Sequence, residues 1–420
     1  MRLSLKKTSL NSARCKMNWD PNRHPDLMKS LIALGLILCL GIAMRIYPSG
    51  AQMKGFDEEL YRKYVVLLNA NGVLKYPDIC QSYINAQREM ATVILPPTRF
   101  IYIYCGHAWS RLFRMAPLPA LHSVSCAFTI LTLLLSAVFT WRVAGPQVAC
   151  AVAALMSFAP TQVHMSQHAL IDGVFAFWAL FAVWCLWENL RAPNHPAWLG
   201  VYALVLALMV MTKENAFFVF VALGGLILIN RWAGFGKVTP ALLIATGGGG
   251  LIGVLCLALL AGGAGSLIEI YKMVVTKASQ LPYAIQFCDG PWHRYLLDLL
   301  LVSPLVMLLA IGEFFQLSAH KKPQLFLAGF VGFSYLVMAN VQYGLNLRYA
   351  NMWDMPLRFL AVSQLGTLAA FFGRRRALVF SIAIVVVCAH ELWQYSEIFV
   401  RARAYELVSE GLLRAVKIVK

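Results

Sequence analysis

The chain has 420 residues, of which 60% are hydrophobic and only 13% are charged, and its formal net charge at pH 7 is +17. A mean hydropathy of +0.65 together with long apolar runs excludes an ordinary soluble protein and indicates a polytopic membrane protein. Much of the excess positive charge lies in short loops between apolar segments, so it indicates membrane topology and attraction to anionic lipids rather than nucleic-acid binding.

Residues 1–29 are polar and basic, and the positive-inside tendency places this tail in the cytoplasm. The first apolar span is predicted over 31–46. The tripeptide at 49–51 loosely resembles a signal-peptidase site. Arg45 before it and the length of the tail favour an uncleaved anchor.

Three consecutive carboxylates follow this span in the stretch FDEELYRKY at 56–64. Read as a helix, the stretch places Asp57, Tyr61 and Tyr64 on one face. A carboxylate at an apolar boundary can act as a general base towards a hydroxyl, which contributes roughly 10²–10⁴ in rate. Asp57 and Glu58 are therefore candidate catalytic acids.

The alternative for this acidic cluster is a hydrated surface. Helical spacing lets Glu58 pair with Arg62, and Glu59 with Lys63, as ordinary salt bridges between residues four apart. The acids then only keep an interfacial helix in contact with water, and we expect this of Glu59 in particular.

Residues 48–117 are too polar to span a membrane and too rich in Tyr, Ile and Leu to be a linker. Within them, 94–113 begins with a proline pair and continues as an aromatic, amphipathic pattern. Prolines suit a first helical turn, and Tyr, Trp and Arg suit an interfacial helix. We expect a first outer loop of amphipathic helices that lie on the membrane surface.

Further apolar segments follow at a regular spacing. They are 118–141, 148–163, 174–187, 198–211, 217–229, 239–261, 297–317, 325–341, 353–372 and 378–393. The sequence thus predicts an all-α polytopic membrane protein with about eleven transmembrane helices. The transmembrane domain is expected over 30–400, with a second long polar region at 262–296 and a basic tail helix at 401–420.

Cation clusters without nearby acids mark alternate ends of these spans, and such ends belong in the cytoplasm with the N-terminus. The clusters are Arg142, Arg231 with Lys237, Lys321 with Lys322, and 374–376. The two long loops then lie on the outer side, together with nearly all acid–base residues of interest. An odd number of spans places the C-terminus on the outer side. The basic tail is in tension with this placement, because basic segments usually lie in the cytoplasm.

Two histidines and an aspartate lie at the outer end of one span. If one helix continues through this stretch, His164, His168 and Asp172 share a stripe, and histidines four apart can bind a metal. No third ligand is fixed by the sequence, and plain polar loop residues are the alternative. Asp172 can cap the apolar helix that it opens, or it can position an acceptor or a phosphate-bound group.

Outer-side cations are candidate phosphate ligands. Lys213 can neutralise a phosphate as a point charge, or it belongs to a short hydrophilic turn. Arg348 suits bidentate phosphate recognition, or it pairs with Asp354. Its neighbour Tyr349 can be part of an interfacial aromatic belt.

His293 and Arg294 precede a span and can hold a lipid head group or act as interfacial anchors. The ten cysteines form no CxxC pair and mostly lie in apolar runs, where Cys behaves as a small hydrophobe. Cys80, Cys105 and Cys288 fall in predicted exposed loops, where one disulfide can form but nothing demands it.

Five motifs in this order resemble the glycosyltransferase C superfamily, specifically its protein O-mannosyltransferase and aminoarabinose-transferase branch. They extend from about residue 30 to 375. The motifs are the acid pair Asp57-Glu58 followed by Tyr61, the Pro-Pro aromatic helix at 96–113, Ala169 to Asp172, Thr212-Lys213, and Arg348-Tyr349 with Pro356.

The resemblance implies an inverting transferase whose donor is a sugar on a polyprenyl monophosphate. Asp57 would be the general base towards the acceptor hydroxyl, with Glu58 as a second candidate. Lys213 and Arg348 would stabilise the leaving phosphate. This branch needs no metal for bond making, although use of a divalent metal stays open.

We assign supporting roles to the other candidates. Tyr349 and Arg294 are expected to contact the donor phosphate. Four further residues are expected to assist the acceptor or support the site: Asp172, His168, Tyr61 and His293. The acceptor is a glycan, a lipid or a protein. Two departures from the branch concern substrate identity, since Gln167-His168 and His122 stand where arginines are frequent.

Two other classes compete with this interpretation. A transporter or lipid flippase should show repeated halves, broken helices and ionisable residues near the midplane, whereas the predicted spans look nearly free of charge. A non-catalytic assembly subunit with the same fold is the third possibility. We expect an integral, multi-pass protein with its active site on the non-cytoplasmic side, and favour a bacterial inner membrane over the endoplasmic reticulum.

Overall fold

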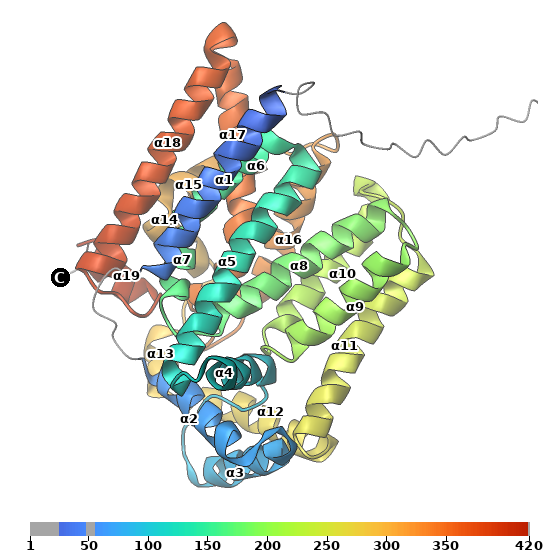
Figure 1. Ribbon diagram of the computed structural model, residues 1–420, viewed down its shortest axis with the longest axis vertical. Coiled ribbons are helices and arrows are strands. Elements are labelled where there is room, and N and C mark those ends of the chain that lie inside the picture. The colour runs from blue at the N-terminus through green and yellow to red at the C-terminus, as the bar shows by residue number, and fades with distance from the viewer. Residues whose placement is uncertain (1–24, 48–54, 419–420) are drawn as a thin grey trace, which may run out of the picture.

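The computed structural model describes residues 25–47 and 55–418, so the tripeptide at 49–51 and most of the basic tail lie outside the described residues. Within these ranges the regular structure is helical and no strand occurs. Figure 1 shows a bundle of long helices with a group of shorter helices, including α2, α3, α4 and α12, at one end. The predicted all-α fold is confirmed.

The element bounds are as follows. They are α1 (Pro25–Ile46), α2 (Phe56–Asn71), η2 (Val73–Lys75), α3 (Tyr76–Glu89), α4 (Phe100–Phe113), α5 (Pro117–Ala144), α6 (Pro146–Ser157), α7 (Pro160–Ser166), α8 (Asp172–Arg191), α9 (Pro196–Val210), α10 (Ala216–Ala233), α11 (Pro240–Leu260), α12 (Ala264–Ala278), α13 (Pro282–Phe287), α14 (Arg294–Val302), α15 (Pro304–Phe314), α16 (Lys322–Met338), η3 (Leu347–Trp353), α17 (Asp354–Ala370), η4 (Gly373–Arg375), α18 (Arg376–Tyr395), η5 (Ser396–Arg401) and α19 (Ser409–Ala415).

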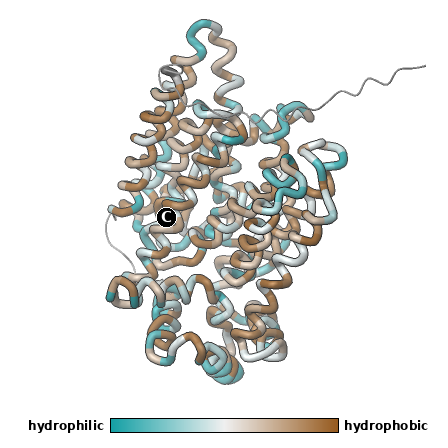
Figure 2. The backbone as a smooth tube through the Cα atoms, turned by 45° about the vertical axis from the view of Figure 1, so that its right-hand side comes forward, coloured by the Kyte–Doolittle hydropathy of each residue, from teal (hydrophilic) through white to brown (hydrophobic). Residues whose placement is uncertain are grey.

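Six of the described helices are long and apolar enough to cross a membrane, or seven if the bent pair α6 and α7 is one span. The predicted total of about eleven therefore stays a prediction. Figure 2 shows hydrophobic residues along the bundle and hydrophilic ones mainly towards its ends.

Prolines break two of the predicted spans. Pro160 begins α7 at 59° to α6, and Pro304 begins α15 directly after α14. Proline lacks the N–H that would continue the preceding helix, and its ring suits a first helical turn. The chain between α7 and α8 is also not helical, so the predicted single stripe of His164, His168 and Asp172 is wrong.

Tyrosine side chains organise the region between α1 and α5, which is the predicted first outer loop. Tyr64, Tyr76 and Tyr83 donate hydrogen bonds of 2.7, 2.6 and 3.1 Å to backbone carbonyls within the segment 94–97. This segment is not helical, and α4 begins only at Phe100, so the proline pair precedes the helix instead of opening it. The loop is a packed helical substructure, as predicted.

Small residues let the bundle helices approach closely. A Cβ added at Gly249 or Gly253 of α11 would lie 2.6 or 2.7 Å from the carbonyl oxygens of Ala203 or Ala207 in α9. Spacing small residues four apart on facing helices allows this backbone contact, which is a common way to pack membrane helices.

The predicted spans are not free of charge, which corrects the expectation from sequence. Arg358 in α17 lies 2.9 Å from Asp354 and 2.5 Å from Glu391 of α18, and all three side chains are buried. Gln162 of α7 donates to Asp354 at 2.9 Å. This network ties α17 to α7 and α18 directly beside η3.

Candidate active site

An ion pair joins the first acidic cluster to the far end of the chain. Asp57 lies in the first turn of α2 and Arg348 in η3, and Asp57 Oδ2 is 3.1 Å from Arg348 Nη2 across 291 residues of sequence. The Arg348 side chain is 6% exposed and that of Asp57 24%. Arg348 therefore pairs with Asp57 and not with Asp354, whose carboxylate binds Arg358.

Part of the Arg348 guanidinium lacks a hydrogen-bond acceptor. Its Nε and Nη1 atoms are buried without a hydrogen bond among the described residues. Glu406 Oε2, at 3.6 Å from Nε, is close enough only for an ion pair. Buried donors are almost always satisfied in native proteins, so this guanidinium retains capacity for an anionic ligand.

A second buried ion pair lies next to the first. Lys213, in the turn between α9 and α10, donates to Asp172 Oδ1 at 2.5 Å. Its ammonium also lies 4.0 Å from the ring centroid of Tyr349, a cation–π contact with the residue after Arg348. Burial lowers the pKa of Lys213, and the Asp172 carboxylate opposes part of that shift.

The structure thus brings Asp57, Arg348, Tyr349, Lys213 and Asp172 into one connected cluster. Asp172 is itself the first residue of α8, and its carboxylate accepts a hydrogen bond from Lys213. The partner of Asp172 is a cation, and the lysine of the predicted hydrophilic turn is 2% exposed. An anion that entered here would find two cations and two carboxylates within one low-dielectric region.

Glu58 points into the protein, so the predicted surface pair with Arg62 is wrong. Its Oε1 accepts hydrogen bonds from the Ala169 backbone N at 3.2 Å and from His168 Nδ1 at 3.0 Å. Its Oε2 lies 3.3 Å from His122 Nε2, and Tyr405 donates to Oε1 at 3.4 Å. Both positions where this chain departs from arginine therefore supply a ligand to Glu58.

Burial alone would raise the pKa of Glu58. The hydrogen bonds from His122 and His168 outweigh that effect and lower the pKa to about 2. Glu58 is therefore a fixed anion at neutral pH, which is poorly suited to accept a proton. The remaining surface acid, Glu59, pairs with Arg62 at 2.6 Å instead of with Lys63.

Tyr61 reaches the cluster through a cation that the sequence interpretation missed. Arg99 donates to the Tyr61 hydroxyl at 2.6 Å and forms a two-point ion pair with Glu214, the residue after Lys213. Arg99 is 6% exposed. The available signal in the sequence was an arginine two residues after the proline pair.

His293 and Arg294 lie apart from this cluster. His293 is exposed. The guanidinium of Arg294 donates to Ser409 at 2.8 Å and to the backbone carbonyls of Phe287 and Asp289, so it fastens a loop and α19. These contacts use all three of its nitrogens within the protein.

The C-terminal segment completes the site, although it appeared only as a basic tail helix in the sequence. Tyr405 and Glu406 contact Glu58 and Arg348, and the backbone carbonyl of Leu407 accepts from the η3 backbone at 3.0 Å. The helix itself spans only Ser409–Ala415. Nothing in the composition of 401–420 indicated these contacts.

The described residues include neither a cluster that could hold a metal ion nor a disulfide. No group of three or more His, Cys, Asp or Glu side chains is placed to hold a metal ion. All nine described cysteines are free thiols, including Cys80, Cys105 and Cys288.

Comparison with known proteins gives a match to one family model over part of the chain. The family model for dolichyl-phosphate-mannose-protein mannosyltransferase matches residues 107–260. No curated protein sequence matches the chain significantly.

Several solved structures share the fold at low sequence identity. The oligosaccharyltransferase of Archaeoglobus fulgidus, in complex with Zn and sulfate, has 14% identity and a TM-score of 0.56, covering 88% of this chain and 54% of its own. ArnT from Cupriavidus metallidurans bound to undecaprenyl phosphate has 13% identity and a TM-score of 0.51, covering 94% and 74%. The archaeal AglB structure with an inhibitory peptide and a dolichol-phosphate has 13% identity and a TM-score of 0.55, covering 87% and 56%.

The chain thus spans about half the length of the oligosaccharyltransferase that it resembles. At sequence identities this low, the similarity to these solved structures shows a shared fold and nothing more. The resemblance inferred from the motifs is confirmed at that level: the chain has the glycosyltransferase C fold, and its residues 107–260 match the mannosyltransferase family model.

Proposed function

We propose that the protein is a membrane glycosyltransferase that moves a sugar from a polyprenyl monophosphate to an acceptor hydroxyl, with inversion. The observation that carries the proposal is the contact between Asp57 and Arg348, in which a partly exposed carboxylate adjoins a buried guanidinium with unsatisfied donors. The polyprenyl phosphates in the solved structures of ArnT and AglB support the donor class.

Donor binding follows from the charges. The phosphate of the donor accepts hydrogen bonds from Arg348 Nε and Nη1, competes with Asp57 for this guanidinium, and is further neutralised by Lys213. Asp57 is thereby released from its ion pair. Tyr349 holds the ammonium of Lys213 in place from the adjoining position in η3.

Transfer is then a single displacement. The acceptor oxygen attacks the anomeric carbon from the face opposite the phosphate, and its proton passes to Asp57. The bond between that carbon and the phosphate oxygen breaks as the new C–O bond forms, which inverts the configuration. Fixed cations stabilise the charge that develops on the phosphate, so bond making needs no metal.

The other candidates act indirectly. Glu58, held by His122 and His168, fixes α2 against the chain before α8, and Tyr61 positions Arg99. In the proposed topology the cluster faces the non-cytoplasmic side, favoured as that of a bacterial inner membrane, where a glycan, lipid or protein hydroxyl is the acceptor.

A transfer assay tests the proposal against the flippase and assembly-subunit alternatives. The full chain is reconstituted in vesicles with a panel of radiolabelled polyprenyl-phosphate sugars and mixed hydroxyl acceptors. We expect one donor to yield a labelled product with inverted anomeric configuration by NMR and free polyprenyl phosphate in equal amount. Movement of a labelled lipid between leaflets without any transfer would contradict the proposal.

A further inference from the structure

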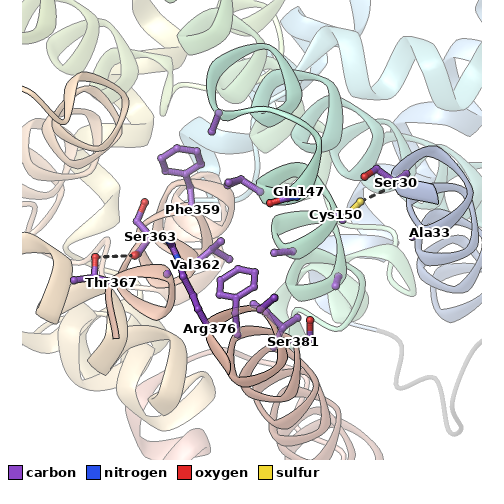
Figure 3. Close-up of a pocket in the computed structure, with 18 of the residues that line it drawn as sticks. Ser30, Ala33, Gln147, Cys150, Phe359, Val362, Ser363, Thr367, Arg376 and Ser381 are labelled. Atoms are coloured by element: carbon purple, nitrogen blue, oxygen red, sulfur yellow. Dashed lines mark hydrogen bonds between the residues drawn. The ribbon is translucent and has the colours of Figure 1, made fainter. Parts of the chain in front are cut away.

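A large cavity lies far from the acid–base cluster, at the end of the bundle where α17 meets α18. It occupies about 1250 Å³ between α1, α6, α17 and α18. Figure 3 shows Phe359, Val362 and Ser363 of α17 across from Gln147 and Cys150 of α6. The cavity exceeds the roughly 300–1,000 Å³ that holds drug-sized ligands, so it has room for a much larger amphiphile.

Most of the cavity lining is apolar and includes Ile37, Val148, Ala154, Phe359, Val362 and Ile384. Polar side chains such as Ser363 and Thr367 lie among them. A Cβ added at Gly366 of α17 meets no atom within 4 Å, so this part of the cavity is open space. Only 6% of the apolar window of α1 and 28% of that of α18 are buried in the protein. A hydrocarbon chain can therefore enter from the surrounding bilayer between these two helices.

The rim of the cavity is cationic. Arg374 and Arg376 line it, as does Lys29, which already has another interaction, and no Asp or Glu occurs among the described lining residues. Arg374 and Arg376 are exposed and have no acidic partner among the described residues. Basic pockets between membrane helices at the cytoplasmic side attract anionic head groups, and arginine suits phosphate through its forked donors.

We propose that this cavity binds an anionic phospholipid, with its phosphate between Arg374 and Arg376 and its acyl chains along α17. The charge complementarity distinguishes this occupant from the chain's own first 24 residues, which carry six Lys and Arg against one Asp and would be repelled by the rim. The site is independent of sugar transfer, since it lies at the other end of the bundle from Asp57.

Native mass spectrometry of the full chain in detergent, with phosphatidylglycerol or phosphatidylcholine added, tests this site. We expect retained phosphatidylglycerol and little phosphatidylcholine. Each cation near a head group contributes several-fold to binding, so Arg374→Gln with Arg376→Gln should lose on the order of tenfold. The matched control, Arg231→Gln with Lys237→Gln, removes the same charge outside the cavity and should bind as the wild type does.

A cavity-filling variant adds a second arm. Gly366→Phe should exclude the lipid while Gly366→Ala retains it, and size-exclusion chromatography checks that both variants are folded. Equal retention of the two lipids, equal losses in both arginine and control pairs, or undiminished binding by a folded Gly366→Phe variant would each overturn the proposal. So would the absence of any bound lipid.

Discussion

At the scale of single residues, the two carboxylates of the acid pair have opposite environments although they adjoin in sequence. Asp57 remains partly exposed against one guanidinium, while Glu58 is 1% exposed and held by two histidines, a tyrosine and a backbone amide. Successive residues of a helix differ in direction by about 100°. Asp57 therefore faces the partly exposed side of α2, where a substrate could reach it, and Glu58 faces the protein interior. In the proposed mechanism, Asp57 therefore accepts the proton and Glu58 supports the start of α2.

Replacing Arg348 by lysine tests the role of the guanidinium fork. Arg348→Lys keeps the positive charge beside Asp57 but loses the planar donors that match a phosphate. We expect KM for the donor to rise by about tenfold or more, with KM for the acceptor unchanged. Arg401→Lys, at an exposed salt bridge with Glu397, is the control and should leave both constants alone. An equal rise for both substrates would count against a phosphate role.

Glu58 should make stability depend on pH. Its pKa of about 2 in the folded protein lies below the ordinary value of 4.5, so its contribution is complete above about pH 4.5 and is lost as the pH falls towards 2. Glu58→Gln should cost roughly 2 kcal/mol at pH 7, since hydrogen bonds to a charged group are lost, and less at pH 3. Thermal unfolding in detergent at both pH values measures this. A deficit that does not change with pH would contradict the assignment.

At the scale of elements, the site depends on three segments that are not membrane spans. These are α2, η3 and the chain from Tyr405 to Leu407, which meet at Arg348 and Glu58. The Arg358 network fixes the first turn of α17. Because α17 directly follows η3 in the chain, the network also holds the end of η3 in place. A Cβ added at Gly55, just before α2, would lie 1.8 Å from the Tyr405 hydroxyl, so the C-terminal segment packs directly on the start of α2.

Truncation separates this segment from the rest of the tail. Ending the chain after residue 403 removes Tyr405, which contacts Glu58. It also removes Glu406, which pairs with Arg348. Because α2 then loses a support at its start, we expect transfer to fall by about tenfold or more, whereas donor binding should not weaken, since Arg348 loses only a competing carboxylate. Ending it after residue 416 keeps α19 and should preserve both. The measurement is transfer in vesicles at equal amounts of folded protein. Full activity without residues 404–420 would remove the C-terminal segment from the site.

The sequence predicted which elements matter better than which contacts they make. Three features stand out in the sequence because each places a charge beside an apolar segment. They are the acidic pair after the first span, the lysine in a turn and the arginine before a late span. Their partners are set by tertiary packing. Glu58 and Arg62 have helical spacing, yet burial of one helix face turned Glu58 inward. Tyr405 carried no such signal, because a lone tyrosine in a basic tail has no period or motif.

At the scale of the whole molecule, charge is distributed unequally between the two ends of the bundle. Cavity-lining residues bring the start of α1 together with the α17–α18 turn, and Lys322 binds the Gly234 carbonyl after α10. The predicted cytoplasmic cations therefore gather at one end. The expectation that they lack nearby acids is wrong for Arg142 and Lys321, which pair with Glu188 and Glu313. Hydropathy predicted the helical fold and the positions of the six long apolar helices among the described residues. It could not resolve broken segments such as α14 with α15, since a short break hardly changes a window average.

This polarity predicts which end faces outwards. In intact cells, a membrane-impermeant maleimide should label the exposed Gln81→Cys variant of α3, whereas Arg375→Cys in the α17–α18 turn should react only after permeabilisation. The wild-type chain gives the background from native cysteines. Labelling of Arg375→Cys in intact cells would reverse the proposed topology and place the candidate site in the cytoplasm.

The measurement that bears most directly on the central claim is single-turnover sugar transfer by Asp57→Asn in reconstituted vesicles. Glu59→Gln, a neighbouring acid on the same helix that binds Arg62, is the matched control. Loss of the base should slow transfer by roughly 10²–10⁴, while donor binding holds or tightens because Arg348 is released, and the control should react as the wild type does. Transfer at the wild-type rate by a folded Asp57→Asn protein would contradict the account.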